Sequence, residues 1–161
     1  MAIAYLGLGG NLGDPELTLP AALQALDGLP GTRLLAASRL YRTPAWGRTN
    51  QPPFVNAAAA VETTLSPEGL LDALLALERR FGRDRIAGER WGPRTLDLDV
   101  LLIDEQVIDH PRLKVPHPHL HERAFALLPL AEIAPLAAIP GHGTVQAVLA
   151  GMESGGLLPI G

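Results

Sequence analysis

The chain has 161 residues and a net charge of −4, with 47% hydrophobic and 19% charged residues, which excludes a disordered chain and predicts one globular domain over residues 1–161. It contains no cysteine, which excludes disulfides and cysteine-ligated zinc sites. Its apolar runs are too short to cross a bilayer and its N-terminus lacks a signal peptide's basic region, so we expect a cytoplasmic protein that binds neither membranes nor nucleic acid.

Short strands and helices are expected in alternation. Strand patterns occupy 3–8, 32–41, 54–63, 96–103 and 106–108. Helices are expected to begin at Asp14-Pro15 and at Ser66-Pro67, where a capping residue precedes a proline, and a third helix is expected over 123–132. The second helix is expected to end near Gly82. Loops are expected over 43–53 and 82–95, and the tail has no strong pattern.

The order of these elements predicts the fold class. Strand, helix, strand, strand, helix and strand follow one another, which is the order of the ferredoxin-like α+β sandwich. We therefore expect an antiparallel sheet with two helices on one face and C-terminal additions. The glycines at 7–13 are interpreted as a tight turn after the first strand, because their spacing does not fit a dinucleotide-binding fingerprint.

The strand at 96–103 carries the sharpest chemical feature, Asp97-Leu98-Asp99. Residues two apart on a strand point to the same side, so both carboxylates share one face, roughly 7 Å apart at Cα. Such a pair can bind one hard cation or bridge two. The alternative is a solvent-facing strand on which each carboxylate pairs with an arginine.

An arginine cluster ends directly on this acidic strand. Six of the thirteen basic residues lie between positions 79 and 94. Guanidinium groups match phosphate geometry, and carboxylate-held magnesium beside arginines is typical of phosphoryl transfer. The alternative is a solvated helix end. No Walker motif is present, so any ATP site is of another kind.

A second pocket is indicated by aromatic and amide side chains. Trp46, Phe54 and Asn56 lie in or beside one predicted loop; an aromatic ring can stack on a planar heterocycle, and an amide can bond to its edge. Ordinary core packing and a strand-start turn are the alternatives. His117, His119 and His121 alternate, but interleaved prolines and the lack of a fourth ligand disfavour zinc. Phosphate or ribose contact by His117 is the preferred interpretation.

Taken together, these segments resemble the 2-amino-4-hydroxy-6-hydroxymethyldihydropteridine pyrophosphokinase family over nearly the whole chain. The segment that carries the resemblance most specifically is RWGPRTLDLD, at 90–99. The other matching segments are YLGLGGNLGD at 5–14, YRTP at 41–44, QP at 51–52, NAA at 56–58, VPH at 115–117 and RAFALLPL at 123–130.

The resemblance implies transfer of pyrophosphate from ATP to 6-hydroxymethyl-7,8-dihydropterin, with release of AMP, in folate synthesis. It implies two Mg²⁺ ions on Asp97 and Asp99, and a catalytic set of Arg83, Arg94, Asp97 and Asp99. The implied ATP-binding residues are Glu78, Arg94, Val100, Arg112, Lys114, His117 and Arg123. The implied pterin-binding residues are Thr43, Pro44, Ala45, Trp46, Phe54, Asn56, Trp91 and Phe125, with Phe54 and Phe125 as the stacking pair. A monomer that acts on these small molecules is expected.

This chain departs from the family pattern at a few positions. The loop after Gly82 is one residue longer than in some members, which leaves the role of Arg85 open, and Lys114 stands where a small hydroxyl residue can contact ATP. Pro118 follows the histidine, and both changes can alter nucleotide affinity. Two other classes, a nucleotide-sensing domain and a nucleic-acid-binding module, are disfavoured by Asp97-x-Asp99 beside Arg94 and by 4% aromatic residues.

Overall fold

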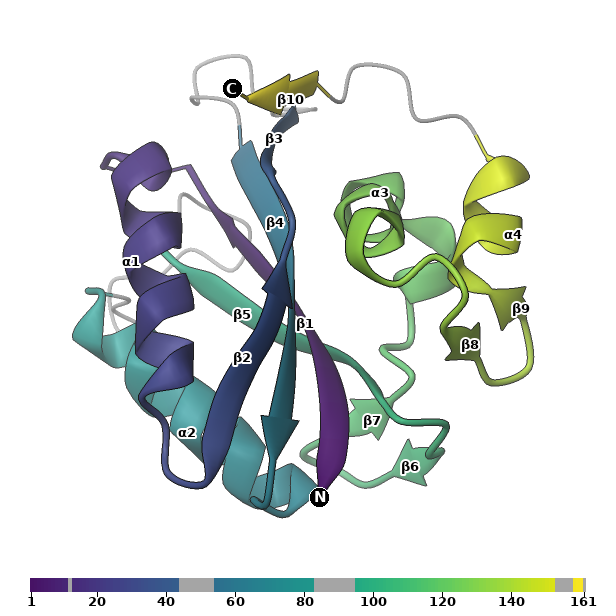
Figure 1. The fold of residues 1–161 in the computed structure, drawn as a ribbon, viewed down its shortest axis with the longest axis horizontal. Helices are drawn as coiled ribbons and strands as arrows, with labels where there is room; N and C mark the ends of the chain where they lie inside the picture. Colours follow the sequence, from purple (N-terminus) through teal and green to yellow (C-terminus); the bar gives the residue numbers. More distant parts are fainter. Residues whose placement is uncertain (12, 44–53, 83–94, 153–157, 161) are drawn as a thin grey trace.

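The computed structural model describes residues 1–11, 13–43, 54–82, 95–152 and 158–160. Its centre is a sheet with the strand order β10-β3-β4-β1-β5, in which β2 also pairs with β4 (Figure 1). The strands of this sheet are β1 (Ala2–Gly10), β2 (Thr32–Ala37), β3 (Leu40–Thr43), β4 (Phe54–Thr63), β5 (Asp97–Ile103) and β10 (Leu158–Ile160). The helices are α1 (Pro15–Asp27), α2 (Pro67–Arg80), α3 (Ala124–Ile133) and α4 (Val145–Ala150), with a 3-10 turn η1 (Leu120–Glu122) before α3. Two small strand pairs join β6 (Ile108–Asp109) to β7 (Lys114–Val115) and β8 (Ala138–Ile139) to β9 (Gly143–Thr144).

The topology confirms the expected fold class. With β2 and β3 taken as one interrupted strand, the chain up to β5 follows the order strand, helix, strand, strand, helix, strand. Each paired strand of the main sheet runs antiparallel to its neighbour. This is the ferredoxin-like arrangement.

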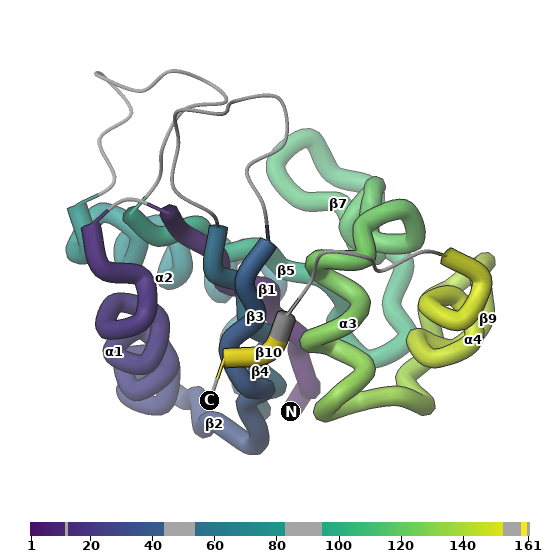
Figure 2. Tube along the Cα trace, turned by 90° about the horizontal axis from the view of Figure 1, so that it is seen from above, coloured from purple at the N-terminus to yellow at the C-terminus, as the bar shows by residue number. Residues whose placement is uncertain are grey.

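Helices α1 and α2 cover one face of the sheet, as Figure 2 shows from above. Ser66 caps α2 as expected, since its Oγ accepts the Gly69 amide at 3.0 Å, and Gly82 follows the helix end with a φ of +91°. Leucines of both helices pack on alternate strand residues such as Leu6 and Leu8. Because side chains alternate along a strand, the residues between these core positions point to the other face of the sheet.

The opposite face carries α3, with α4 packed beside it (Figure 2). Leu127 and Leu130 of α3 are fully buried against Leu101 of β5 and Val145 of α4. The tail is thus more ordered than its sequence pattern indicated, because β8, β9 and α4 extend this second core. The last strand, β10, pairs with β3.

Two predicted strands differ in detail from the structure. The strand expected over 32–41 is interrupted at Ser38 and Arg39, where Ser38 bonds through its amide and its hydroxyl to the backbone of Ala58. Because the Ser38 hydroxyl accepts the Ala58 amide in place of a backbone carbonyl, the strand can be interrupted here without loss of that hydrogen bond. The short strand expected at 106–108 begins two residues later, at Ile108, because Gln106 closes a turn onto Ile103.

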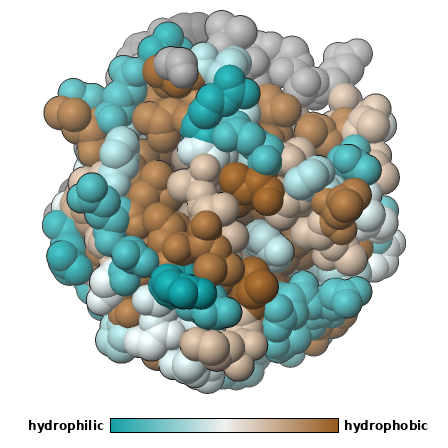
Figure 3. Space-filling view, in the orientation of Figure 1, coloured by the Kyte–Doolittle hydropathy of each residue, from teal (hydrophilic) through white to brown (hydrophobic). Residues whose placement is uncertain are grey.

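The surface is mixed in polarity. Figure 3 shows apolar side chains gathered over the middle of the face seen in Figure 1, with hydrophilic side chains around them. Large exposed apolar residues include Leu17 and Leu136, each 71% exposed. In the described part of the chain, no helix is both long enough and apolar enough to cross a membrane.

Candidate active site

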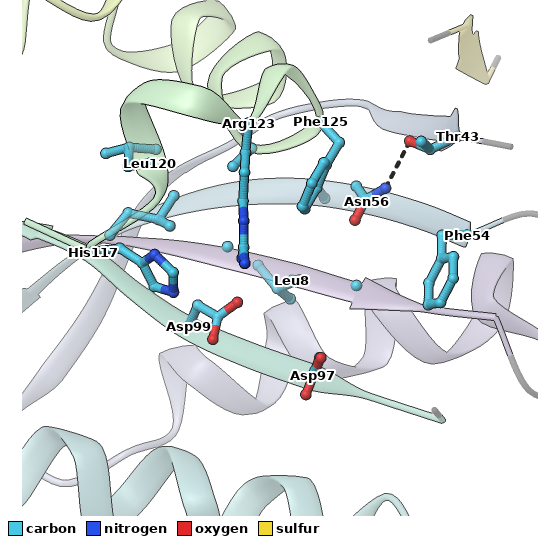
Figure 4. Close-up of a pocket in the computed structure, with 15 residues that line it drawn as sticks. Leu8, Thr43, Phe54, Asn56, Asp97, Asp99, His117, Leu120, Arg123 and Phe125 are labelled. Carbon is cyan, nitrogen blue, oxygen red and sulfur yellow. Dashed lines mark hydrogen bonds between the residues drawn. The ribbon is translucent and has the colours of Figure 1, made fainter. Parts of the chain in front are cut away.

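A cavity of about 360 Å³ lies between the sheet and the start of α3 (Figure 4). Strands β1, β4 and β5 form one wall, and the segment from 117 to 126 forms the other. The polar and aromatic residues that line it are Thr43, Phe54, Asn56, Asp97, Asp99, His117, Arg123 and Phe125. Eight of the residues expected from the sequence therefore meet in one cavity.

Asp97 and Asp99 share the cavity face of β5, as the strand period predicts. Their neighbours Leu98 and Val100 are buried in the core on the opposite face of the sheet, under α1 and α2. Asp97 is half-buried and Asp99 is exposed, so water, ions and phosphate oxygens can reach both carboxylates.

Two glycines of β1 lie directly across from these aspartates. Gly9 pairs with Asp97 and Gly7 with Asp99, and both glycines line the cavity. A Cβ placed on Gly9 would lie 2.9 Å from Oδ1 of Asn56, so a side chain at this position would force the Asn56 amide to move. The interpretation of Gly9 and Gly10 as part of a turn is wrong, since β1 extends to Gly10. Glycine spacing of two within a strand is the signal of close approach that could have indicated this.

A buried amide and two aromatic rings form the end of the cavity nearest β3. Asn56 is 8% exposed, and its Nδ2 donates to Oγ1 of the buried Thr43 at 2.8 Å. This bond fixes the amide orientation, with Oδ1 on the side of Gly9. Phe54 begins β4 and Phe125 lies in the first turn of α3, so the two rings approach from different elements (Figure 4). A flat polar heterocycle fits such a site.

The opposite end of the cavity carries His117 and Arg123. Burial, with charge repulsion from Arg123 and His119, lowers the pKa of His117 from 6.5 to about 4. His117 is therefore neutral near pH 7, and because its Nδ1 accepts the His119 amide at 3.2 Å, the ring proton lies on Nε2. Figure 4 shows this ring and the Arg123 guanidinium directed toward the same part of the cavity as Asp99. Both groups are donors suited to anionic oxygens.

Glu78 and Val100 are not part of the cavity lining. Glu78 is 2% exposed and accepts the Leu98 amide at 2.7 Å, on the edge of β5 that faces away from β1. Since backbone groups alternate along a strand, the amide and carbonyl of Val100 point to this same edge. The Val100 side chain packs in the core, so only its backbone can contact a ligand.

Arg112 and Lys114 make ion pairs away from the cavity. Arg112 binds Asp72 and lies 3.8 Å from Glu68, both on α2, and the bond to Asp72 raises the pKa of the guanidinium. Lys114 of β7 binds Asp109 of β6, and this contact lowers the pKa of Asp109. Neither basic group lines the cavity.

Several expected site residues lie outside the described residues. They are Arg83, Arg94, Pro44, Ala45, Trp46 and Trp91, and Arg85 lies there too. For zinc, the described part of the chain gathers no group of three or more His, Asp or Glu side chains suited to a metal. His121 instead stacks on His142, with ring centroids 4.1 Å apart.

Comparisons with known sequences identify one family. The family described as 7,8-dihydro-6-hydroxymethylpterin-pyrophosphokinase matches residues 5–135. A 2-amino-4-hydroxy-6-hydroxymethyldihydropteridine pyrophosphokinase of Pseudomonas aeruginosa is 51% identical over 91% of this chain and 89% of its own. Another of Methylorubrum extorquens is 47% identical over 98% of both chains.

A solved structure supports the fold. The Plasmodium falciparum HPPK-DHPS triple mutant with SDX-DHP aligns with a TM-score of 0.70 at 16% identity, over 93% of this chain and 44% of that one. At this identity the likeness concerns the fold alone. The family match and the two relatives give one conclusion: this chain belongs to the 7,8-dihydro-6-hydroxymethylpterin-pyrophosphokinase family.

Proposed function

We propose that this protein transfers pyrophosphate from ATP to 6-hydroxymethyl-7,8-dihydropterin in folate biosynthesis. The hydroxymethyl oxygen of the pterin bonds to the β-phosphorus, the bond from that phosphorus to the oxygen bridging the α-phosphorus breaks, and AMP leaves. The hydroxyl proton passes to solvent. One observation carries the proposal beyond family membership: the Asp97–Asp99 face and the Asn56 amide lie in the same cavity.

Asp97 and Asp99 would hold two Mg²⁺ ions. Two carboxylates on one strand face suit a hard cation, and oxygens of water and substrate would supply the remaining ligands. When bound, Mg²⁺ neutralises phosphate charge and polarises the attacking hydroxyl. The chain's own contribution is to hold both carboxylates at the cavity wall without steric crowding, since glycines stand opposite them.

The pterin would bind between β4 and α3. Phe54 and Phe125 would cover its two faces, while Asn56 would bond to its edge through an amide that Thr43 already orients. Because this amide is fixed before binding, little conformational entropy is lost when the heterocycle enters. By resemblance, Pro44, Ala45, Trp46 and Trp91 complete this side.

ATP would lie toward β5 and the segment before α3. His117 Nε2–H and the Arg123 guanidinium would donate to phosphate oxygens, and the backbone of Val100 at the strand edge would face the base. Glu78 would keep that edge in place through its bond to Leu98. By resemblance, Arg83, Arg94, Arg112 and Lys114 also serve the nucleotide; for Arg112 this requires exchange of its contact with Asp72 for phosphate. We also propose that the enzyme is a cytoplasmic monomer.

The test is to mix the protein with ATP, magnesium and the dihydropterin, omitting pterin and metal in turn. AMP and the pterin diphosphate should form only in the complete mixture. Asp97→Asn should abolish nearly all turnover with an unchanged circular dichroism spectrum, because one of two carboxylate ligands loses its charge. Formation of ADP would indicate γ-phosphoryl transfer, nucleotide binding without product would indicate a sensing domain, and a fully active Asp97→Asn would refute the metal assignment.

A further inference from the structure

A cluster of Arg39, Tyr41 and Glu132 lies outside the cavity lining. The Tyr41 hydroxyl donates to Glu132 Oε1 at 2.5 Å, and Arg39 donates to the same oxygen from Nε at 3.1 Å. The backbone amide of Arg39 donates to Glu132 Oε2 at 2.9 Å. One carboxylate of α3 therefore accepts three bonds from the segment at the break between β2 and β3.

The protonation states of this cluster support these bond directions. Burial and the bond to Glu132 raise the pKa of Tyr41, so its hydroxyl stays protonated and donates. Burial alone would raise the pKa of Glu132, but the bonds from Tyr41 and Arg39 outweigh it and hold that pKa below its ordinary value. Glu132 is therefore an ionised acceptor, for which hydrogen bonds are stronger than between neutral groups.

Each partner in the cluster is rigidly connected to the proposed pterin site. Tyr41 of β3 lies opposite Asn56 of β4. Thr43, two residues further along the same face of β3, accepts a hydrogen bond from the Asn56 amide. On α3, Glu132 lies two helical turns after Phe125, and the helix packs on β3 and β4. The cluster thus joins the two walls that carry the amide and one of the rings.

We infer that Tyr41 and Glu132 are positioning residues for the pterin: their contact sets the separation between Phe125 on α3 and Asn56 on β4. The inference rests on the proposed assignment of these two residues to the pterin. If the gap between the Phe125 ring and the sheet widens by a fraction of an ångström, the ring loses stacking contact with a flat ligand. The nucleotide end of the cavity is built on β5 and the segment before α3, so it should be affected less.

The experiment compares KM for the pterin and for ATP in the full-length protein. Tyr41→Phe and Glu132→Ala should raise the pterin KM by about tenfold, because a lost hydrogen bond to a charged group corresponds to a factor of that order. The ATP KM should change by less than about twofold. The double variant should resemble Glu132→Ala, since Glu132→Ala already removes the contact that Tyr41→Phe breaks.

Glu62→Ala is the matched control. Glu62 is 28% exposed like Glu132 and also pairs with an arginine, Arg33, at 3.3 Å, but at the far end of the sheet. It should leave both KM values unchanged. Equal rises in the two KM values, or a lower melting temperature with an unchanged pterin KM, would show a purely structural cluster and overturn the inference.

The variant Asn56→Ala tests the assignment of the pterin site separately from the positioning role of Tyr41 and Glu132. If Asn56→Ala raises the pterin KM while Tyr41→Phe and Glu132→Ala do not, the positioning role is wrong and the pterin site stands. If Asn56→Ala has no effect on pterin KM, the pterin assignment is wrong and the positioning role is refuted with it.

Discussion

The substitution Gly9→Ala tests how closely the cavity wall is fitted to the Asn56 amide. The added Cβ would lie 2.9 Å from Asn56 Oδ1, whereas ordinary contacts begin at 3.4 Å, so the amide must retreat by about 0.5 Å. Asn56 is only 8% exposed and is bonded to Thr43 at 2.8 Å, so the retreat must stretch that bond or force an unfavourable rotamer.

The expected cost follows from these two terms. A weakened buried hydrogen bond costs about 0.5–1.5 kcal/mol, and an off-rotamer side chain costs about the same again. Together they amount to about 1–3 kcal/mol. Because the displaced amide must regain its original position to bond to the pterin, binding loses this energy, which corresponds to a loss in affinity of about 5- to 140-fold. The free energy of unfolding should fall by less, because replacing glycine within a strand recovers about 0.5–1 kcal/mol.

Pterin affinity is measured by equilibrium binding in a double-mutant cycle with Asn56→Ala. In that background the added methyl group meets no amide, so Gly9→Ala should have almost no further effect. An equal loss of affinity in both backgrounds would refute the steric argument, and so would unchanged affinity of the single Gly9→Ala variant.

Two further predictions concern His117 and the start of α2. The His117 pKa of about 4 in the folded chain lies below its ordinary 6.5, so only the unfolded chain binds this proton as the pH falls from 6.5 to 4. The contribution of His117 to the free energy of unfolding is therefore present above pH 6.5 and is lost as the pH falls from 6.5 to 4. Urea titrations should show that the free energy of unfolding of His117→Gln depends less on pH over this range. Identical pH dependence in the variant and the original protein would contradict the lowered pKa. Ser66→Ala removes the cap bond to Gly69 and should lower the free energy of unfolding by about 1 kcal/mol with both KM values unchanged. A loss of activity at unchanged stability would show that Ser66 does more than cap the helix.

Local patterns were enough to predict much of the site. The strand period alone places Asp97 and Asp99 on one face, and the structure agrees. The proline signals located α1 and α2. Such features depend on residues near one another in sequence, where periodicity and capping rules apply.

Features that depend on distant partners were not predictable in this way. The break at Ser38 requires the backbone of Ala58, and the pairing of Arg112 requires an aspartate of α2. The contact between Tyr41 and Glu132 joins residues 91 positions apart. No local rule indicates which distant carboxylate a basic or hydroxyl group will meet, so these contacts come only from the three-dimensional arrangement.

The alanine run of β4 has a consequence for how this sequence can vary. Residues Ala57–Ala60 are at most 6% exposed; Ala57 and Ala59 pack in the core under α1 and α2, and Ala58 packs in the core under α3. Their small methyl groups let the layers on both faces pack close to the central strand, so larger side chains would force these layers apart. In a saturation library selected for growth without added folate, these four positions should tolerate fewer replacements than the leucines around them. When a leucine is replaced by another apolar residue, neighbouring side chains can repack to compensate for the change in volume.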